Sequence, residues 1–199
     1  MFRNGVDLTS NVELPVAENA RRILFNGTWQ ARKGAATLAR AAEKLHSNGV
    51  RISWVLAGTG MDRAELLRNW PNGLHASTEV IPKFSGQEEA ALYQRCNLFV
   101  LPSFFEGQPL ALLQAMAHGR CCITTNSCGQ KDILRHGVNG LLIKPGDSTA
   151  LVRLIENTVA DLPQQIKLGA NARQTVEDRG WEAVSLEVVS YVERVFAAG

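Results

Sequence analysis

Short apolar runs alternate with helix-period stretches along this chain, and this alternation restricts its fold more than any other feature. Six runs are expected to be strands, and several of them lack the apolar–polar alternation of a half-exposed strand. Strands that are separated by helices pair in parallel, and continuous apolar strands are typical of a sheet covered on both faces. The sequence therefore predicts an α/β fold with a parallel sheet of about six strands. The expected strands are Arg22–Phe25, Ile52–Ala57, Thr78–Ile81, Leu98–Leu101, Cys121–Thr124 and Leu141–Ile143.

Two helices are expected after the last strand, which is more than one closed βα unit requires. The terminal one has more apolar surface than a solvated helix needs. Its sequence leaves two interpretations open, because the helix can dock on a second body or pack on its own domain. The expected helices are Lys33–Asn48, Asp62–Asn69, Gln87–Arg95, Pro109–His118, Gln130–Arg135, Ser148–Ala160, Pro163–Arg179 and Trp181–Ala197.

Composition and charge exclude several classes of protein. The chain has 199 residues, 45% of them hydrophobic, which is enough for one full domain or at most two small ones. The net charge is +2, and Lys and Arg form no basic stripe, so nucleic acid is not an expected partner. No apolar stretch approaches the roughly 20 residues needed to cross a bilayer, so no transmembrane segment is expected.

Cysteines and histidines give no sign of a metal site. Cys96, Cys121, Cys122 and Cys128 lack metal-ligand or redox spacing, and the histidines lack ligand spacing. Small buried thiols in a reducing cytosol are the favoured interpretation. His118 is near the C-terminus of an expected helix, where it is expected to act as a favourable end charge.

The segment Ser103–Gly119 carries the strongest functional signal. A buried strand leads into a polar loop that contains Glu106, and Pro109 then suits the first turn of a helix. The helix start offers the backbone N–H groups of Leu110 and Ala111 and a positive dipole end, which together suit a phosphate. An acidic residue before a helix can also simply complement the dipole, but the loop is more specific than an ordinary cap, so we favour a functional role for Glu106.

Lys33 is the second candidate. It follows Arg32 and is expected at the start of a helix, where a cation is disfavoured by up to roughly 1 kcal/mol. A bound anion would relieve that conflict, although a Lys on an exposed turn is also common. Lys33, Glu106 and Pro82 all come just after strand ends, and ligands of parallel sheets bind at the carboxyl ends of the strands. We therefore expect the three to share one crevice.

Two further signals are weaker. Gln114 lies inside an apolar helix, where its side chain needs a partner that can be a ligand hydroxyl or a nearby carbonyl. Gly58-Thr59-Gly60-Met61-Asp62-Arg63 follows a strand, and Glu79 lies where a ribose-binding acid would be expected. Arg63 replaces the third glycine of a dinucleotide fingerprint, so a tight turn is favoured over NAD binding.

Four motifs occur in order and at fitting distances: Ile23-Leu24-Phe25-Asn26-Gly27 with Lys33-Gly34, Val55-Leu56-Ala57-Gly58-Thr59-Gly60, Leu98 to Gly107, and Asn139-Gly140-Leu141-Leu142-Ile143. Together they resemble the C-terminal half of the retaining GT-B glycosyltransferases, family 4 or "group 1". The resemblance covers nearly all of the chain and implies a Rossmann-like donor-binding domain. It implies that residues 1–10 are the remnant of an interdomain linker and that residues 11–180 form the donor domain. Residues 181–199 would then cross back to an N-terminal acceptor domain that is absent here.

The resemblance also implies a function: transfer of a hexosyl unit from a nucleoside-diphospho-sugar to an acceptor hydroxyl, with retention and without a metal or other cofactor. Lys33 would contact the diphosphate, Glu106 would face the donor sugar, and Gln114 would bind the ribose. The acceptor, a sugar, lipid-linked sugar or glycan, would bind through the absent domain, in a cytoplasmic protein that can associate with the inner face of the membrane. The remaining implied donor-binding residues are Gly27, Thr28, Arg32, Ile81, Pro82, Lys83, Gly107, Gln108, Pro109, Leu110 and Ala111.

Two departures from the family pattern bear on activity. Gln114 stands where the family has a second glutamate, and Thr28 stands where it often has arginine, a cation that Arg32 can replace from another point of the loop. These departures favour the main alternative, a non-catalytic module that binds nucleotide or a partner protein. A sugar-nucleotide epimerase of GT-B architecture is a second alternative. In the transferase interpretation, this chain alone binds donor and transfers little or no sugar.

Overall fold

A computed structural model describes residues 4–8 and 12–197 of the chain. Six parallel strands form one sheet in the order β3-β2-β1-β4-β5-β6. This confirms the predicted sheet, and it is the strand order of a doubly wound fold, in which the direction of winding changes between β1 and β4. The strands are β1 (Arg22–Asn26), β2 (Ser53–Ala57), β3 (Thr78–Ile81), β4 (Leu98–Leu101), β5 (Cys121–Thr125) and β6 (Leu141–Ile143).

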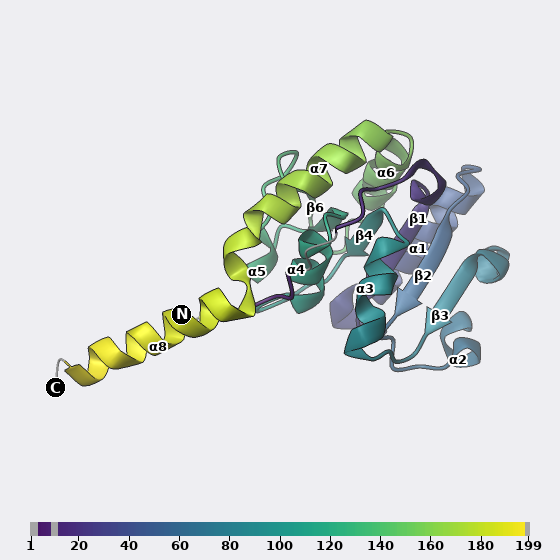
Figure 1. Ribbon diagram of the computed structural model, residues 1–199. Helices are drawn as coiled ribbons and strands as arrows, with labels where there is room; N and C mark the ends of the chain where they lie inside the picture. The colour runs from purple at the N-terminus through teal and green to yellow at the C-terminus, as the bar shows by residue number, and fades with distance from the viewer. Residues whose placement is uncertain (1–3, 9–11, 198–199) are drawn as a thin grey trace.

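Helices cover both faces of this sheet (Figure 1). Seven of the eight expected helices form with similar bounds, although several are shorter than predicted because their ends are 3-10 turns or caps. The helix expected at Gln130–Arg135 is displaced, because α5 shares only Gln130 and Lys131 with it. The short 3-10 helices Ala17–Asn19 (η1) and Asn72–Ser77 (η3) lie outside the expected helices. The α-helices are α1 (Ala35–Ser47), α2 (Arg63–Leu67), α3 (Gly86–Gln94), α4 (Leu110–Ala117), α5 (Cys128–Lys131), α6 (Ser148–Val159), α7 (Leu162–Thr175) and α8 (Trp181–Ala197).

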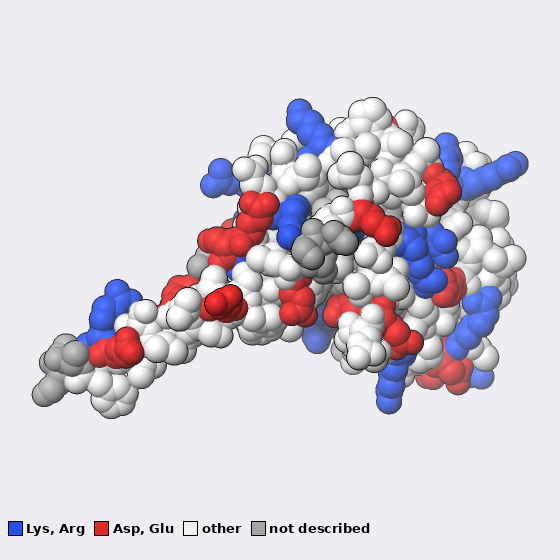
Figure 2. Space-filling model, viewed as in Figure 1, with Lys and Arg blue, Asp and Glu red and all other residues white. Residues whose placement is uncertain are grey.

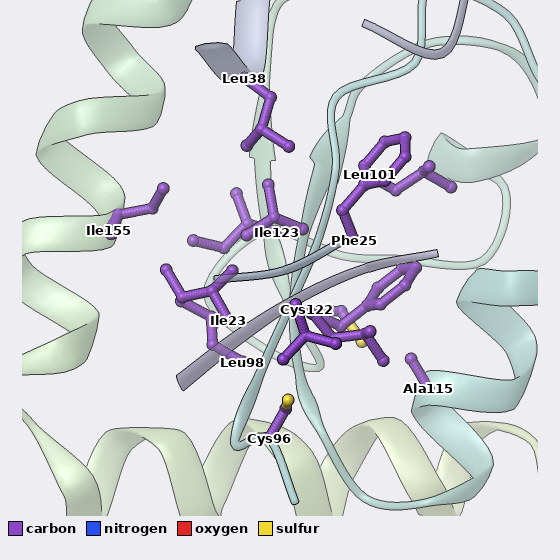
Figure 3. Close-up of a cluster of buried hydrophobic side chains, with 14 of the residues drawn as sticks. Ile23, Phe25, Leu38, Cys96, Leu98, Leu101, Ala115, Cys122, Ile123 and Ile155 are labelled. Atoms are coloured by element: carbon purple, nitrogen blue, oxygen red, sulfur yellow. The ribbon is translucent and has the colours of Figure 1, made fainter. Parts of the chain in front are cut away.

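The core lies between the sheet and its two helix layers. Figure 3 shows Leu38 from α1 and Ile155 from α6 beside the strand residues Ile23 and Ile123, and all four side chains are fully buried. Ala115 brings α4 against the sheet from the other face. The central strands β4 and β5 are buried along their whole length, which explains their continuous apolar sequence.

The terminal helix α8 projects away from the body of the molecule (Figure 1). Most of its large apolar side chains are exposed, although Val184 is buried, and Figure 2 shows mostly uncharged surface along it. No helix among the described residues is long and apolar enough to cross a membrane. The exposed residues are Trp181, Leu186, Val189, Tyr191, Val192, Val195 and Phe196.

The described part of the expected linker lies at the base of α8. The N–H of Val6 donates to the carbonyl of Arg179 at 2.8 Å, and Val6 pairs with Gly180 in a parallel bridge. Gly5 packs so closely on Trp181 that a Cβ would lie 2.4 Å from the indole ring. Residues 1–3 and 9–10 of the expected linker and the last two residues of the terminal segment lie outside the described residues.

Candidate functional site

The loops after β1 and β4 meet at the carboxyl edge of the sheet, where the winding direction changes. Gly34 has a φ of +78°, and a Cβ there would lie 2.0 Å from the carbonyl oxygen of Pro102. The N–H of Phe104 donates to the carbonyl of Arg32 at 2.8 Å. The two loops are therefore held in backbone contact, which only glycine at position 34 permits.

This contact brings Lys33 and Glu106 together. The Nζ of Lys33 lies 2.7 Å from Oε1 of Glu106, and their side chains are only 16% and 8% exposed. The hydroxyl of Ser103 donates to the same carboxylate oxygen at 2.8 Å. The structure thus places the two strongest candidates in direct contact. The prediction that Lys33 is an unfavourable cation at a helix start was wrong. Lys33 is the last residue of the 3-10 helix Ala31–Lys33 (η2), and α1 begins at Ala35. The lysine is stabilised by the carboxylate that it faces.

The segment after β5 supports the Glu106 loop from a third side. The hydroxyls of Thr125 and Ser127 donate to the carbonyls of Ser103 and Phe104 at 2.6 and 2.8 Å. The N–H of Gly129 donates to the carbonyl of Glu106 at 2.9 Å, and a Cβ on Gly129 would lie 1.9 Å from the carbonyl oxygen of Gly107. These hydrogen bonds fix the backbone on which Glu106 stands.

Sequence reasoning missed this support, although the run Thr124-Thr125-Asn126-Ser127 signalled it. Four small polar residues that end an apolar strand are typical of side chains that bond to neighbouring backbone. Gln130 completes the network. It is fully buried, its Oε1 lies 2.8 Å from the Thr125 hydroxyl, and its Nε2 donates to Thr124 and to the carbonyl of Leu101.

Helix α4 begins one residue later than predicted, so Pro109 is its N-cap rather than part of its first turn. The first intrahelical bond runs from Leu113 N–H to the carbonyl of Pro109. The N–H groups of Leu110 and Ala111 precede this bond and have no acceptor within the helix. Leu110 is 49% exposed and Ala111 is partly exposed, so the first turn of α4 is open to a ligand.

The two glutamines of the predicted site differ in their surroundings. Oε1 of Gln108 accepts from the N–H of Asn4, which ties the predicted donor loop to the N-terminal segment. Gln114 is partly exposed in the middle of α4, and its side chain has no hydrogen-bond partner within residues 4–8 and 12–197. A nearby carbonyl therefore does not satisfy Gln114 in the described part of the chain.

The remaining predicted residues border the loops after β1 and β3. Gly27 lies beside Lys33, because a Cβ on Gly27 would be 3.8 Å from the lysine Cδ and Cε. Thr28 and Arg32 are exposed, and Arg32 has no ion pair among the described residues. Lys83 is also exposed, in the loop after β3.

The loop after β2 forms a tight turn. The N–H groups of Gly58 and Gly60 donate to the carbonyls of Ile81 and Pro82 at 2.9 and 3.1 Å, and both glycines have a positive φ. Arg63 stands where the fingerprint has its third glycine. Its side chain donates to the carbonyl of Thr78, so it ties the start of α2 to the start of β3. The geometry favours the tight-turn interpretation over a dinucleotide site.

His118 corrects one prediction. It is 3% exposed and stacks on Tyr93 with ring centroids 5.1 Å apart. Burial, reinforced by the nearby guanidinium groups of Arg120 and Arg173, lowers the pKa of His118 to about 4. The imidazole is therefore neutral at pH 7 and is no end charge for α4.

The cysteines are free thiols, and Cys96, Cys121 and Cys122 are buried while Cys128 is half-buried. Burial raises the pKa of Cys96 and Cys121 to about 12, so these thiols are unreactive core residues. The described residues contain no cluster of three His, Cys, Asp or Glu side chains that could hold a metal ion.

Comparison with known proteins identifies the family. The profile of the Glycosyl transferases group 1 family matches residues 9–175. This chain belongs to that family. The glycosyltransferase MJ1607 of Methanocaldococcus jannaschii is 25% identical over 88% of this chain and 45% of its own length. The GDP-mannose-dependent alpha-mannosyltransferase of Corynebacterium glutamicum is 27% identical over 89% of this chain and 41% of its own length.

Solved structures agree with this assignment. Sucrose-phosphate synthase from Thermosynechococcus elongatus superimposes with a TM-score of 0.83 and 27% identity over 98% of this chain and 52% of that one. HepE of Anabaena, solved with UDP and glucose, shares the fold with a TM-score of 0.77 and 19% identity, over 89% of this chain and 49% of that one. The chain is thus a Rossmann-like half of GT-B architecture and spans about half the length of the relatives it matches.

Proposed function

We propose that this group 1 chain is the donor-binding domain of a retaining, metal-independent glycosyltransferase that moves a hexosyl unit from a nucleoside-diphospho-sugar to an acceptor hydroxyl. The observation that carries the proposal is the Lys33–Glu106 pair at 2.7 Å, placed where the sheet reverses its winding. Ligands of doubly wound sheets bind at this point. Membership of the glycosyltransferase family favours a transferase over a non-catalytic module or an epimerase.

Each side chain has a role in the proposed reaction. Lys33 has three N–H donors, so it can keep its bond to Glu106 and still bind a diphosphate oxygen. The open N–H groups of Leu110 and Ala111 would hold the distal phosphate. As the sugar–phosphate bond breaks, the lysine and the helix start would stabilise the charge that develops on the leaving diphosphate, which is the expected main contribution to catalysis.

Glu106 would face the donor sugar. Its Oε1 already accepts from Lys33 and Ser103, and the described residues offer no partner for Oε2. An ionised carboxylate can accept from two sugar hydroxyls, and the fixed loop would hold it ready for them. Gln114 would bind the ribose, and the backbone of Ile81–Lys83 would meet the base.

The other parts of the chain have proposed roles as well. Residues 1–10 would be the linker to an N-terminal acceptor half, residues 11–180 the donor domain, and residues 181–199 the segment whose apolar helix returns to that half. The acceptor, a sugar, lipid-linked sugar or glycan, would bind there. The free buried thiols suit a cytoplasmic protein, and the full-length protein would work at the inner face of the membrane when its acceptor is lipid-linked.

Calorimetric titration of the chain with UDP, GDP and ADP, first without metal and then with magnesium, tests the proposal. We expect one nucleoside diphosphate to bind without metal and Lys33→Ala to weaken it. Lys167→Ala, an exposed change on α7, is the control and should leave binding unchanged. Absence of binding by all three nucleotides would refute the proposal for this chain. Loss of sugar transfer by Glu106→Ala in the full-length protein would test the catalytic assignment.

A further inference from the structure

Glu89 is a partly buried carboxylate with weak hydrogen bonding. It lies on α3, where its Oε1 is 3.5 Å from Nδ2 of Asn26 and 3.4 Å from the hydroxyl of Tyr93. Both distances are long for hydrogen bonds, and burial raises the pKa of Glu89. Figure 2 shows acidic side chains gathered over α3. A carboxylate that loses hydration and has two long contacts within the described residues retains most of its capacity to accept hydrogen bonds from a ligand.

Its neighbours place this carboxylate at the rim of the donor crevice. Asn26 ends β1 and directly precedes Gly27, and its Oδ1 lies 2.9 Å from where a Cβ on Gly58 would be. The hydroxyl of Tyr93 donates to the carbonyl of Ala111, in the first turn of α4, at 3.1 Å. The group around Glu89 thus contacts the loops after β1 and β2 and the open start of α4.

Gln114 lies on the side of α4 that faces this group. Residues three and four apart share a helix face, so Ala111 and His118 flank Gln114 on that face. Ala111 accepts from the Tyr93 hydroxyl, and His118 stacks on the Tyr93 ring. Helices α3 and α4 lie side by side (Figure 1). Gln114, which has no partner in the described chain, therefore lies on the face of α4 that meets Tyr93, and Glu89 lies one turn from Tyr93 on α3.

We propose that Glu89 is a specificity residue that accepts a hydrogen bond from a ribose hydroxyl of the nucleotide, beside Gln114. This inference rests on the proposed function. The two ribose hydroxyls form a diol that offers two protons, and a glutamine presents only one acceptor oxygen for them. A carboxylate from α3 supplies the second acceptor with charge assistance. The site then selects ribonucleotides over deoxyribonucleotides through a pair of side chains from two helices.

The test compares four probes on three proteins. The probes are the nucleoside diphosphate that the wild-type chain binds, its 2′- and 3′-deoxy forms, and inorganic pyrophosphate. The proteins are the wild type, Glu89→Gln and the control Glu88→Gln, which changes an exposed neighbour and keeps a side chain suited to its capping box with Ser85. Glu89→Gln preserves the shape of the side chain, and thermal unfolding checks that it folds.

We expect Glu89→Gln to weaken the ribonucleotide about tenfold, the effect of one charge-assisted hydrogen bond. It should leave pyrophosphate binding unchanged, and its effect should vanish for the deoxy form that lacks the contacted hydroxyl. Wild-type affinity of Glu89→Gln for the ribonucleotide, or an equal loss for pyrophosphate, would overturn the inference and leave the proposed function standing. A wild-type chain that binds no nucleoside diphosphate would refute both.

Discussion

Removing the lysine from the Lys33–Glu106 pair should destabilise the domain measurably. Both side chains are largely buried, and within the described residues Lys33→Met would leave Glu106 with Ser103 as its remaining polar contact. Breaking a buried ion pair by removing one partner costs about 3–5 kcal/mol. The residual exposure of the pair and the Ser103 hydrogen bond reduce this, so we expect a loss of about 2–3 kcal/mol. In a chain of this length that lowers the melting temperature by about 4–12 °C.

A double-mutant cycle separates the ion pair from simple loss of packing. The free energy of unfolding would be measured in urea for the wild type, Lys33→Met, Glu106→Gln and the double variant. Because the second change removes the carboxylate that the first one strands, the double variant should be more stable than the sum of the two losses predicts. Additive losses, or a Lys33→Met variant as stable as the exposed control Lys167→Met, would refute the reasoning.

Three further changes test the packing and the site. Gly34→Ala should cost about 3 kcal/mol in urea unfolding because its Cβ would meet the carbonyl of Pro102, whereas Gly49→Ala, with the same φ of +78° and open space around it, should cost much less. Gln114→Glu should tighten nucleoside diphosphate binding by about fivefold in calorimetry, and unchanged affinity would remove Gln114 from the site. The lowered pKa of His118, about 4 against 6.5, means that the unfolded chain binds the proton more readily. Its contribution to stability is therefore complete above pH 6.5 and is lost as the pH falls toward 4, by about 2–3 kcal/mol. His118→Phe, which keeps a ring on Tyr93, should flatten this part of the stability–pH curve.

The inner strands could be predicted as continuous apolar runs because nearly all of their residues are buried. Thr78–Ile81, Leu98–Leu101 and Leu141–Ile143 have the predicted bounds, since a short run between turn residues leaves little choice of start and end. Parallel pairing then places the carboxyl ends of the strands at one edge. That rule alone predicted that Lys33 and Glu106 lie near each other, but it did not predict their ion pair.

The support of the site could not be predicted in the same way. The hydrogen bonds from Thr125 and Ser127 to the Glu106 loop join segments more than twenty residues apart. The small polar run that contains both residues indicates bonding to backbone, but it does not specify which segment accepts. The prediction for His118 failed for a related reason, because its charge depends mainly on burial against Tyr93 of α3, and also on the adjacent Arg120 and on Arg173 of α7. Periodicity identifies the element on which a side chain stands, whereas long-range packing determines its protonation and its partners.

The two carboxylates of the site are held very differently, and this difference suits their proposed roles. Glu106 stands on a loop tied to the segments after β1 and β5, with strong bonds to Lys33 and Ser103. Its position is therefore set during folding, so ligand binding does not have to supply the free energy that orders this side chain. A group that stabilises developing charge requires such preorganisation. In the described part of the chain, the contacts of the Glu89 carboxylate are long, so its oxygens can still accept hydrogen bonds from a ligand. In the proposed site, the rigid Glu106 would lie at the bond that reacts, and the weakly bonded Glu89 would lie at the nucleotide. Hydrogen bonds to Glu89 would then contribute to donor selectivity without changing the geometry around the reacting bond.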